Sequence, residues 1–301
     1  MALVPGCGFA VNNFFPRESK EEIDRVMELP ALVEERGFDS VWLGDHVLFH
    51  MPIIDATVLL GAFAATTRTV TLGTSIYLLG LRQPGIAAKF FTSLNAVVDG
   101  RLALGVGAGG EYPPEFEFAG VPHERRGALL DEALDVLLTQ WRAEHGGPRP
   151  EPRGSTPPTL LVGGRSNPAR RRIIRLGAGW LGAWVSPQRI AQEVTTLAEM
   201  AGQPVPVALN IYLRTGDDSD EAHRKASDFL GSFYNMPSEP LMRYSVAGTA
   251  EECLEQLLEY ADAGVEHFVL RPAAWDQHDQ LDRWAEVIRP ALQRRVRGED
   301  R

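Results

Sequence analysis

The chain of 301 residues has few of the residues that build a disulfide framework or a basic surface. Its two cysteines, Cys7 and Cys253, lie far apart in the sequence, which argues against a disulfide scaffold and against a thiol cluster for a metal. Lys and Arg number 30 against 40 Asp and Glu. The resulting net charge of −10 argues against nucleic acid and anionic membrane surfaces as main partners.

Long apolar runs are also missing. No segment approaches the roughly 20 apolar residues that a membrane-spanning helix needs, and the N-terminal segment lacks the basic and apolar regions of a secretory signal. The sequence therefore predicts a cytoplasmic protein, and the net negative charge still allows an anionic small molecule to bind where arginines gather locally.

Several motifs of well-known enzyme classes are absent. No G-x-G-x-x-G follows the first expected strand, and the sequence contains no P-loop and no G-x-S-x-G. His46 and His50 have the spacing of a helical metal-binding pair, but they follow an expected strand and precede Pro52, and no third ligand stands beside them. We therefore expect no metal site.

Short apolar runs alternate with helical patterns along the whole chain, and this alternation indicates the fold. Strands joined by crossover helices must be parallel, so eight such units predict a single (β/α)8 TIM barrel of class α/β over residues 1–301. An open doubly wound sheet is the alternative. Two stretches interrupt the alternation, residues 144–158 and 216–247, and we expect them to be loop insertions at the C-terminal mouth of the barrel.

The segment "SVWLGDH" places two ionisable side chains, Asp45 and His46, directly after an apolar strand. Barrel enzymes carry their active sites at the C-terminal ends of the strands, so this position favours a functional role. Histidine can donate or accept a proton near neutral pH, and a neighbouring carboxylate can orient the site. A loop histidine that faces solvent or caps a helix is the alternative that these residues leave open.

The segment "LLVGGRSNPARRR" is typical of an anion-binding turn. Gly163 and Gly164 allow a ligand to approach the backbone, and Ser166 or Asn167 can cap the following helix. A helix N-terminus presents free N–H groups that favour phosphate, and Arg165 adds a full positive charge there. The same residues would also form a well-capped helix without a ligand.

Five segments, in register along the chain, together resemble a known family: "GFDSVWLGDH", "VTLGTSIYLLGLRQPGIAAKFFTSLNAVVDGRLALGVGAGG", "VPHERRGALLDEALDVLLTQW", "LLVGGRSNPARRRIIRLGAGW" and "VAGTAEECLEQLLEYADAGVEHFVL". The chain resembles the bacterial luciferase-like flavin monooxygenase superfamily over nearly its whole length, most closely the branch that uses the deazaflavin coenzyme F420. The resemblance implies the luciferase-like barrel. It also implies an oxidoreductase that moves a hydride between F420 and an organic small-molecule substrate.

The resemblance implies roles for four residues after the second and third strands. Asp45 matches the residue that contacts the deazaflavin, and His46 matches the proposed proton donor or stabiliser, which makes His46 the expected catalytic residue. Ser75 and Ile76 match the place where the third strand bulges through a non-prolyl cis peptide behind the ring.

Five further cofactor-binding residues are implied by the fourth and fifth loops. Ala108 and Gly109 match positions near the cofactor in the fourth loop. The phosphate-binding turn of the family is matched by Gly164, Arg165 and Ser166.

The chain also departs from its relatives. The F420-dependent glucose-6-phosphate dehydrogenases carry a glutamate where Gly110 aligns and a tryptophan where His50 aligns. The missing acid argues against oxidation of a sugar phosphate but not against the cofactor. Because the tail of F420 carries several carboxylates, we expect Arg149 and Arg153 of the first insertion to assist the turn in binding it.

Two alternative functions remain at this point. One is an FMN-dependent luciferase-like monooxygenase that activates dioxygen, and the other is a barrel that binds the cofactor without turnover. A homodimer is compatible with the resemblance, and the substrate is not indicated by the sequence.

Overall fold

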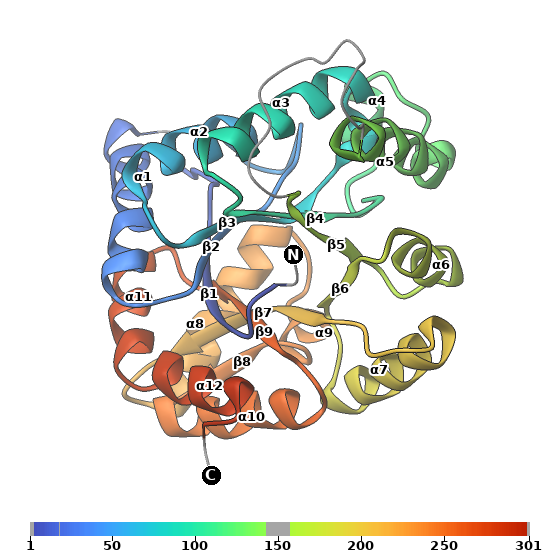
Figure 1. Ribbon diagram of the computed structural model, residues 1–301. Coiled ribbons are helices and arrows are strands. Elements are labelled where there is room, and N and C mark those ends of the chain that lie inside the picture. Colours follow the sequence, from blue (N-terminus) through green and yellow to red (C-terminus); the bar gives the residue numbers. More distant parts are fainter. Residues whose placement is uncertain (1–2, 18, 143–156, 300–301) are drawn as a thin grey trace.

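The computed structural model describes residues 3–17, 19–142 and 157–299, and its centre is a closed parallel barrel (Figure 1). Eight strands close it in the order β1 (Gly6–Val11), β2 (Ser40–Leu43), β3 (Thr71–Tyr77), β4 (Leu102–Val106), β5 (Thr159–Gly163), β6 (Gly179–Ala183), β7 (Val207–Thr215) and β9 (His267–Pro272). Strand β9 pairs in parallel with both β7 and β1, which closes the ring. The predicted (β/α)8 TIM barrel is confirmed, and the open sheet is excluded.

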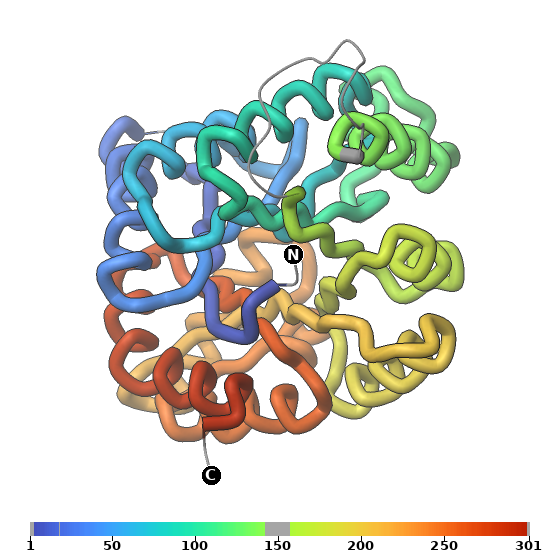
Figure 2. The backbone as a smooth tube through the Cα atoms, in the orientation of Figure 1, coloured from blue at the N-terminus to red at the C-terminus, as the bar shows by residue number. Residues whose placement is uncertain are grey.

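Helices surround the barrel, and the chain passes around the ring in sequence order, as the colours of Figure 2 show. The longer helices are α1 (Lys20–Glu35), α2 (Ala56–Thr66), α3 (Pro84–Val97), α5 (Arg126–Arg142), α6 (Asn167–Leu176), α7 (Pro187–Ala201), α8 (Ser219–Tyr234), α10 (Ala250–Asp262), α11 (Gln277–Glu286) and α12 (Ile288–Arg297). Short helical turns are η1 (Leu79–Leu81), α4 (Pro114–Phe118), η2 (His123–Arg125) and α9 (Glu239–Met242). None of the described helices is both long enough and apolar enough to cross a membrane.

Helix ends follow the local sequence. Helix α10 begins at a capping box, in which the Thr249 hydroxyl accepts from the Glu252 backbone N–H and the Glu252 carboxylate accepts from the Thr249 N–H. Ser19 caps α1 in the simpler way, through one bond from Glu22 N–H. Helix α6 ends at Gly177, which adopts the left-handed conformation that glycine tolerates best.

The interior of the barrel is filled by one layer of apolar side chains, and the layer above it is small. The filled layer contains Ala10, Trp42, Ala103, Leu161, Leu181, Ala208 and Val269. Successive inward positions of a strand are two residues apart, so the next layer toward the C-terminal ends comprises Asn12, Gly44, Ser75, Gly105, Gly163, Ala183, Asn210 and Arg271. Four small residues of this layer, Gly44, Ser75, Gly163 and Ala183, line the space above the core, whereas the Thr74 carbonyl fills the position beside Gly105.

The two expected insertions have different outcomes. Residues 216–247 contain α8, α9 and the start of β8 (Val246–Gly248), a short strand that pairs with the end of β7. The sequence analysis did not predict β8. Residues 144–156 of the other insertion, with Arg149 and Arg153, lie outside the described residues.

Candidate active site

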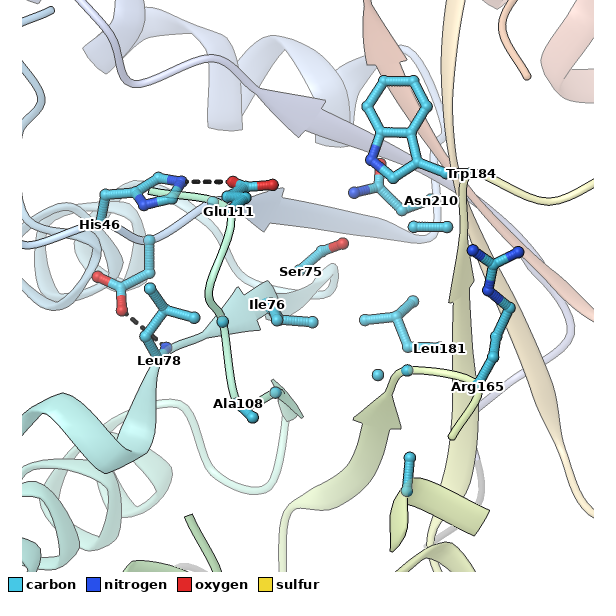
Figure 3. A pocket seen from close by; sticks show the side chains of 18 of the residues that line it. His46, Ser75, Ile76, Leu78, Ala108, Glu111, Arg165, Leu181, Trp184 and Asn210 are labelled. Atoms are coloured by element: carbon cyan, nitrogen blue, oxygen red, sulfur yellow. Dashed lines mark hydrogen bonds and ion pairs between the residues drawn. The ribbon is translucent and has the colours of Figure 1, made fainter. Parts of the chain in front are cut away.

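A cavity of about 540 Å³ opens above the small layer, at the C-terminal ends of the strands. All of the site residues predicted from the sequence line it: Asp45, His46, Ser75, Ile76, Ala108, Gly109, Gly164, Arg165 and Ser166. In Figure 3, His46 and Glu111 lie on one side of the cavity, with Trp184, Asn210 and Arg165 on the other. The structure therefore brings these residues together, while the role of each remains a proposal.

The His46 ring is held between two carboxylates. It directly follows Asp45 after β2, and its Nδ1 lies 3.0 Å from Glu115 Oε2 while its Nε2 lies 2.9 Å from Glu111 Oε1 (Figure 3). Glu115 is fully buried, whereas about half of the Glu111 side chain is exposed. The Phe49 ring stacks on the imidazole at 4.3 Å between centroids, so the ring is fixed in position and orientation.

The two carboxylates change the charge of His46. Burial acts to lower the pKa of the imidazole, but the hydrogen bonds and negative charges of Glu111 and Glu115 outweigh burial and raise the pKa to about 9. His46 is therefore an imidazolium at neutral pH, with both N–H groups donating. In this state it can supply a proton but cannot accept one.

Asp45 turns away from the open part of the cavity. Its carboxylate is buried and receives two bonds from the Arg82 guanidinium, at 2.5 and 2.6 Å, and one from the Leu78 backbone N–H at 2.9 Å. Burial raises the pKa of Asp45, the guanidinium acts to lower it, and the same contact raises the pKa of Arg82. These bonds attach the loop after β2 to the segment after β3 and so fix the loop that carries His46.

The peptide bond between Ser75 and Ile76 is cis, as the resemblance implied. The pairing of β3 with β4 shifts register between Thr74 and Tyr77, so the strand bulges there. A Cβ at position 107 would lie 2.2 Å from Ile76 Cδ1, so glycine leaves room for the Ile76 side chain in its present position. Ile76 therefore forms an apolar part of the cavity wall.

The loop after β4 carries two acids that the sequence analysis did not identify. Its first residues, Ala108 and Gly109, line the cavity as expected, and Gly109 and Gly110 both have positive φ. The chain then delivers Glu111 to His46, and α4 delivers Glu115. Glu111, one residue after Gly110, thus faces His46. The absence of a glutamate at position 110 is therefore no longer an argument against a sugar-phosphate substrate.

The predicted anion-binding turn has the expected geometry. Gly164 adopts φ +101°, and the Ser166 hydroxyl accepts from the Ala169 N–H at the start of α6. The Arg165 side chain is exposed at the edge of the cavity and makes no hydrogen bond or ion pair with the described residues. The free N–H groups of α6 and this guanidinium form a positively charged end of the cavity.

Two more arginines line this end of the cavity. Arg172 is buried and paired with Asp131, at 2.7 Å. Arg126 donates to the carbonyl of His123 at 3.1 Å and has no carboxylate partner in the described part of the chain. The cavity therefore has a local positive charge although the whole chain is acidic.

Strands β7 and β9 and helix α8 contribute residues that the sequence analysis missed. Tyr212 of β7 and Tyr234 of α8 share a hydrogen bond at 3.1 Å between their hydroxyls, and Trp184 stacks on the Tyr212 ring. Arg271 of β9 is almost fully buried. Inward-facing positions recur every two residues along a strand, and this period predicts Tyr212 and Arg271. Nothing in the sequence around Tyr234 predicts that it lies at the cavity.

Among the described residues, no group of three or more His, Cys, Asp or Glu side chains is arranged to hold a metal ion. Cys7 and Cys253 are both buried and free.

Comparison with known proteins identifies similar sequences along most of the chain. The family model for luciferase-like monooxygenases matches residues 8–243. The F420-dependent glucose-6-phosphate dehydrogenase of Beutenbergia cavernae is 27% identical, and the alignment covers 96% of this chain and 97% of that protein.

Solved structures share the fold. An F420-dependent secondary alcohol dehydrogenase in complex with an F420-acetone adduct superposes with a TM-score of 0.79 at 21% identity, over 96% of this chain and 99% of that one. The oxygenating constituent of 3,6-diketocamphane monooxygenase from Pseudomonas putida, in complex with FMN, gives 0.74 at 17% identity, over 97% of each chain. At these identities the superpositions show the fold alone.

Proposed function

Because the chain belongs to the luciferase-like monooxygenase family, we propose that it is an F420-dependent oxidoreductase that moves a hydride between the deazaflavin and an organic small molecule. A relative that is named as F420-dependent, and that aligns over 96% of this chain and 97% of its own, supports this branch of the family. The observation that carries the proposal is a single cavity that joins a basic turn at Arg165 to a protonated histidine at His46.

The residues at the basic end fit a coenzyme with an anionic tail. The N-terminus of α6 with Ser166 and Gly164 can bind a phosphate through backbone N–H groups. Arg165 and Arg126, neither of which has an acidic partner in the described residues, can pair with carboxylates beyond the phosphate. An acidic protein needs such local positive charge to bind a polyanion at all.

The middle of the cavity fits a flat ring. Ile76 presents an apolar side chain from the cis segment and packs against Gly107 and Gly163, and Ala108 adds only a methyl group to the lining. Phe14, Tyr212, Phe233 and Tyr234, which belong to one aromatic cluster, form another part of the cavity wall. A planar system can thus contact apolar surface while its edges reach backbone polar groups.

When bound, the deazaflavin supplies the hydride donor or acceptor carbon, and the protein supplies position and proton transfer. His46 Nδ1–H is committed to the buried Glu115, so Nε2 is the nitrogen that can exchange a proton with the substrate. In the direction of substrate reduction, Nε2–H donates to the oxygen that gains negative charge. In the direction of oxidation, Glu111, which is half exposed beside Nε2, is placed to receive the proton.

Cofactor titration tests the proposal. Purified protein is titrated with F420 and, in parallel, with FMN, and binding is followed by the absorbance and fluorescence of each cofactor. We expect saturable F420 binding, weaker FMN binding, and F420 turnover with at least one member of an alcohol and carbonyl panel. Tight FMN binding without F420 binding would support the monooxygenase, and F420 binding without any turnover would support the non-catalytic barrel.

We also propose a homodimer. Helices α2 and α3 contact each other and expose Val58, Ile86 and Val97 to solvent, and a second copy of the chain could cover these apolar side chains. Light scattering after size exclusion measures the mass directly, and a monomer of 33.1 kDa would refute the dimer.

A further inference from the structure

Arg271 is a charged side chain in the small layer that forms the floor of the cavity. It lies on β9, two residues after Val269, which belongs to the apolar layer below, so both side chains point into the barrel. Its guanidinium rests on Gly44, where an added Cβ would meet Nη2 at 3.5 Å. The side chain is only 3% exposed, and it lines the cavity.

The contacts of this guanidinium are neutral and few. Nη1 donates to Asn12 Oδ1 and Nη2 donates to the Ser75 carbonyl oxygen, both at 3.3 Å. The Tyr212 ring lies 5.8 Å away. No carboxylate of the described residues forms an ion pair with Arg271, and two hydrogen bonds use only part of the five N–H donors of a guanidinium.

The only other buried arginine of the described residues, Arg172, has a carboxylate partner, and so do the partly buried Arg82 and Arg170. Arg82 has Asp45, Arg172 has Asp131 and Arg170 has Glu193 as its carboxylate partner. A buried charge without a partner lowers stability, because desolvation is not offset by an opposite charge. An anionic group of a ligand would supply the missing opposite charge.

We propose that Arg271 binds a carboxylate of the organic substrate, so that the substrate is an organic acid with an apolar body. The Ser75 hydroxyl, which has no hydrogen-bond partner in the described structure and is 6% exposed, lines the same floor and can donate a second bond. This inference rests on the proposed function, in which a second molecule shares the cavity with the coenzyme.

The position of Arg271 assigns it to the substrate and not to the coenzyme tail. Strand β9 lies opposite β4 in the ring, whereas the basic turn follows β5 and carries its own Arg165. The walls of the cavity also include aromatic rings, which match an apolar body: Phe14, Trp184, Tyr212, Phe233 and Tyr234. No lysine of the described residues lines the cavity, and one partly used guanidinium fits a carboxylate better than a phosphate dianion, which takes more donors.

Two matched probes test the inference. Calorimetric titration of F420-loaded protein with 3-phenylpropanoate and with the uncharged 3-phenylpropanamide compares an acid with a neutral analogue of the same shape. We expect the wild type to bind the acid at least about tenfold more tightly than the amide, since a charged hydrogen bond in a buried site contributes that much. Arg271→Gln should remove this preference, Arg271→Lys should retain part of it, and the exposed Arg224→Gln should leave it unchanged.

Thermal melting separates a ligand-binding role from a structural one. Arg271→Gln should melt at or above the wild-type temperature without ligand, and 3-phenylpropanoate should raise the midpoint of the wild type only. Equal binding of the two probes by the wild type would overturn the inference. An Arg271→Gln variant that melts at a lower temperature than the wild type and still prefers the acid would also overturn the inference. If Arg271→Gln loses more affinity for F420 than for 3-phenylpropanoate, Arg271 contacts the deazaflavin ring and the inference fails. If the wild type binds no F420, the proposed function fails, and the two probes still report on Arg271 in the protein without coenzyme.

Discussion

Replacing Glu111 with glutamine changes the charge beside His46 while keeping the size of the side chain and one hydrogen-bond acceptor. In the wild type, the two glutamates raise the pKa of His46 from its ordinary value of 6.5 to about 9. That difference corresponds to on the order of 3 kcal/mol in favour of the charged ring. Glu111 is the carboxylate at Nε2 and supplies a large part of it.

We expect Glu111→Gln to lower the pKa of His46 by about 1–2 pH units, because one opposite charge at hydrogen-bond distance contributes that much. Nitrogen-15 NMR of labelled histidine rings measures the titration directly. Glu117→Gln is the matched control, because Glu117 is exposed on the same short helix as Glu115 and should leave the titration unchanged.

The same change should appear in the pH dependence of substrate reduction. A wild-type enzyme that donates a proton from His46 keeps its activity up to about pH 9, and the Glu111→Gln variant loses activity at a correspondingly lower pH. A His46 ring that titrates near 6.5 in the wild type, or whose titration is the same in Glu111→Gln, would refute this account of the site.

Four other outcomes can be measured. His46→Ala should reduce turnover by on the order of 10²–10⁴ with a much smaller change in F420 affinity, measured by steady-state kinetics and titration; near-full activity would show that His46 is not the proton donor. Because the folded pKa of His46 is raised, its contribution to the free energy of unfolding is fully present below pH 6.5 and is lost as the pH rises through about 9; urea unfolding at both ends should show a larger loss in the wild type than in His46→Ala. F420 affinity should fall as salt rises, since exposed charges are screened over about 8 Å at physiological ionic strength, and it should fall further in Arg165→Ala; a salt-independent affinity would contradict the basic turn. Gly107→Ala should push Ile76 into the cavity, weaken F420 binding and cost roughly 1–3 kcal/mol of stability in chemical unfolding, whereas unchanged binding would show that Ile76 has room to move.

The fold was predictable from the sequence because its signals are local. Apolar runs such as "TLLVG" and "HFVLR" became β5 and β9, and Asp55 and Pro84 mark the starts of α2 and α3 as helix signals do. Strand β8 was missed because it has only three residues and pairs with the end of β7, a contact between segments distant in sequence.

The candidate site was only partly predictable, for a physical reason. A residue such as His46 that follows a strand is found by position, since the fold fixes where strand ends lie. Its partners Glu111 and Glu115 come from a glycine-rich loop and a short helix, whose path depends on packing against Phe49 and other distant residues. Arg271 could have been found by extending the two-residue period to the last strand, but only the three-dimensional structure shows that no carboxylate of the described residues pairs with it.

The layer of small side chains beneath the cavity has a consequence for the stability of the protein without its coenzyme. Gly44, Ser75, Gly163 and Ala183 leave the layer above the core open, so a ligand that occupies the cavity completes the packing of the barrel interior. A bound coenzyme then acts as the last component of the core, and its concentration adds to stability as RT ln(1 + [L]/Kd), which is about 2.7 kcal/mol at a hundredfold excess over Kd. A cell that runs short of the coenzyme would therefore lose enzyme molecules as well as enzyme activity, because the empty protein unfolds and is degraded more readily.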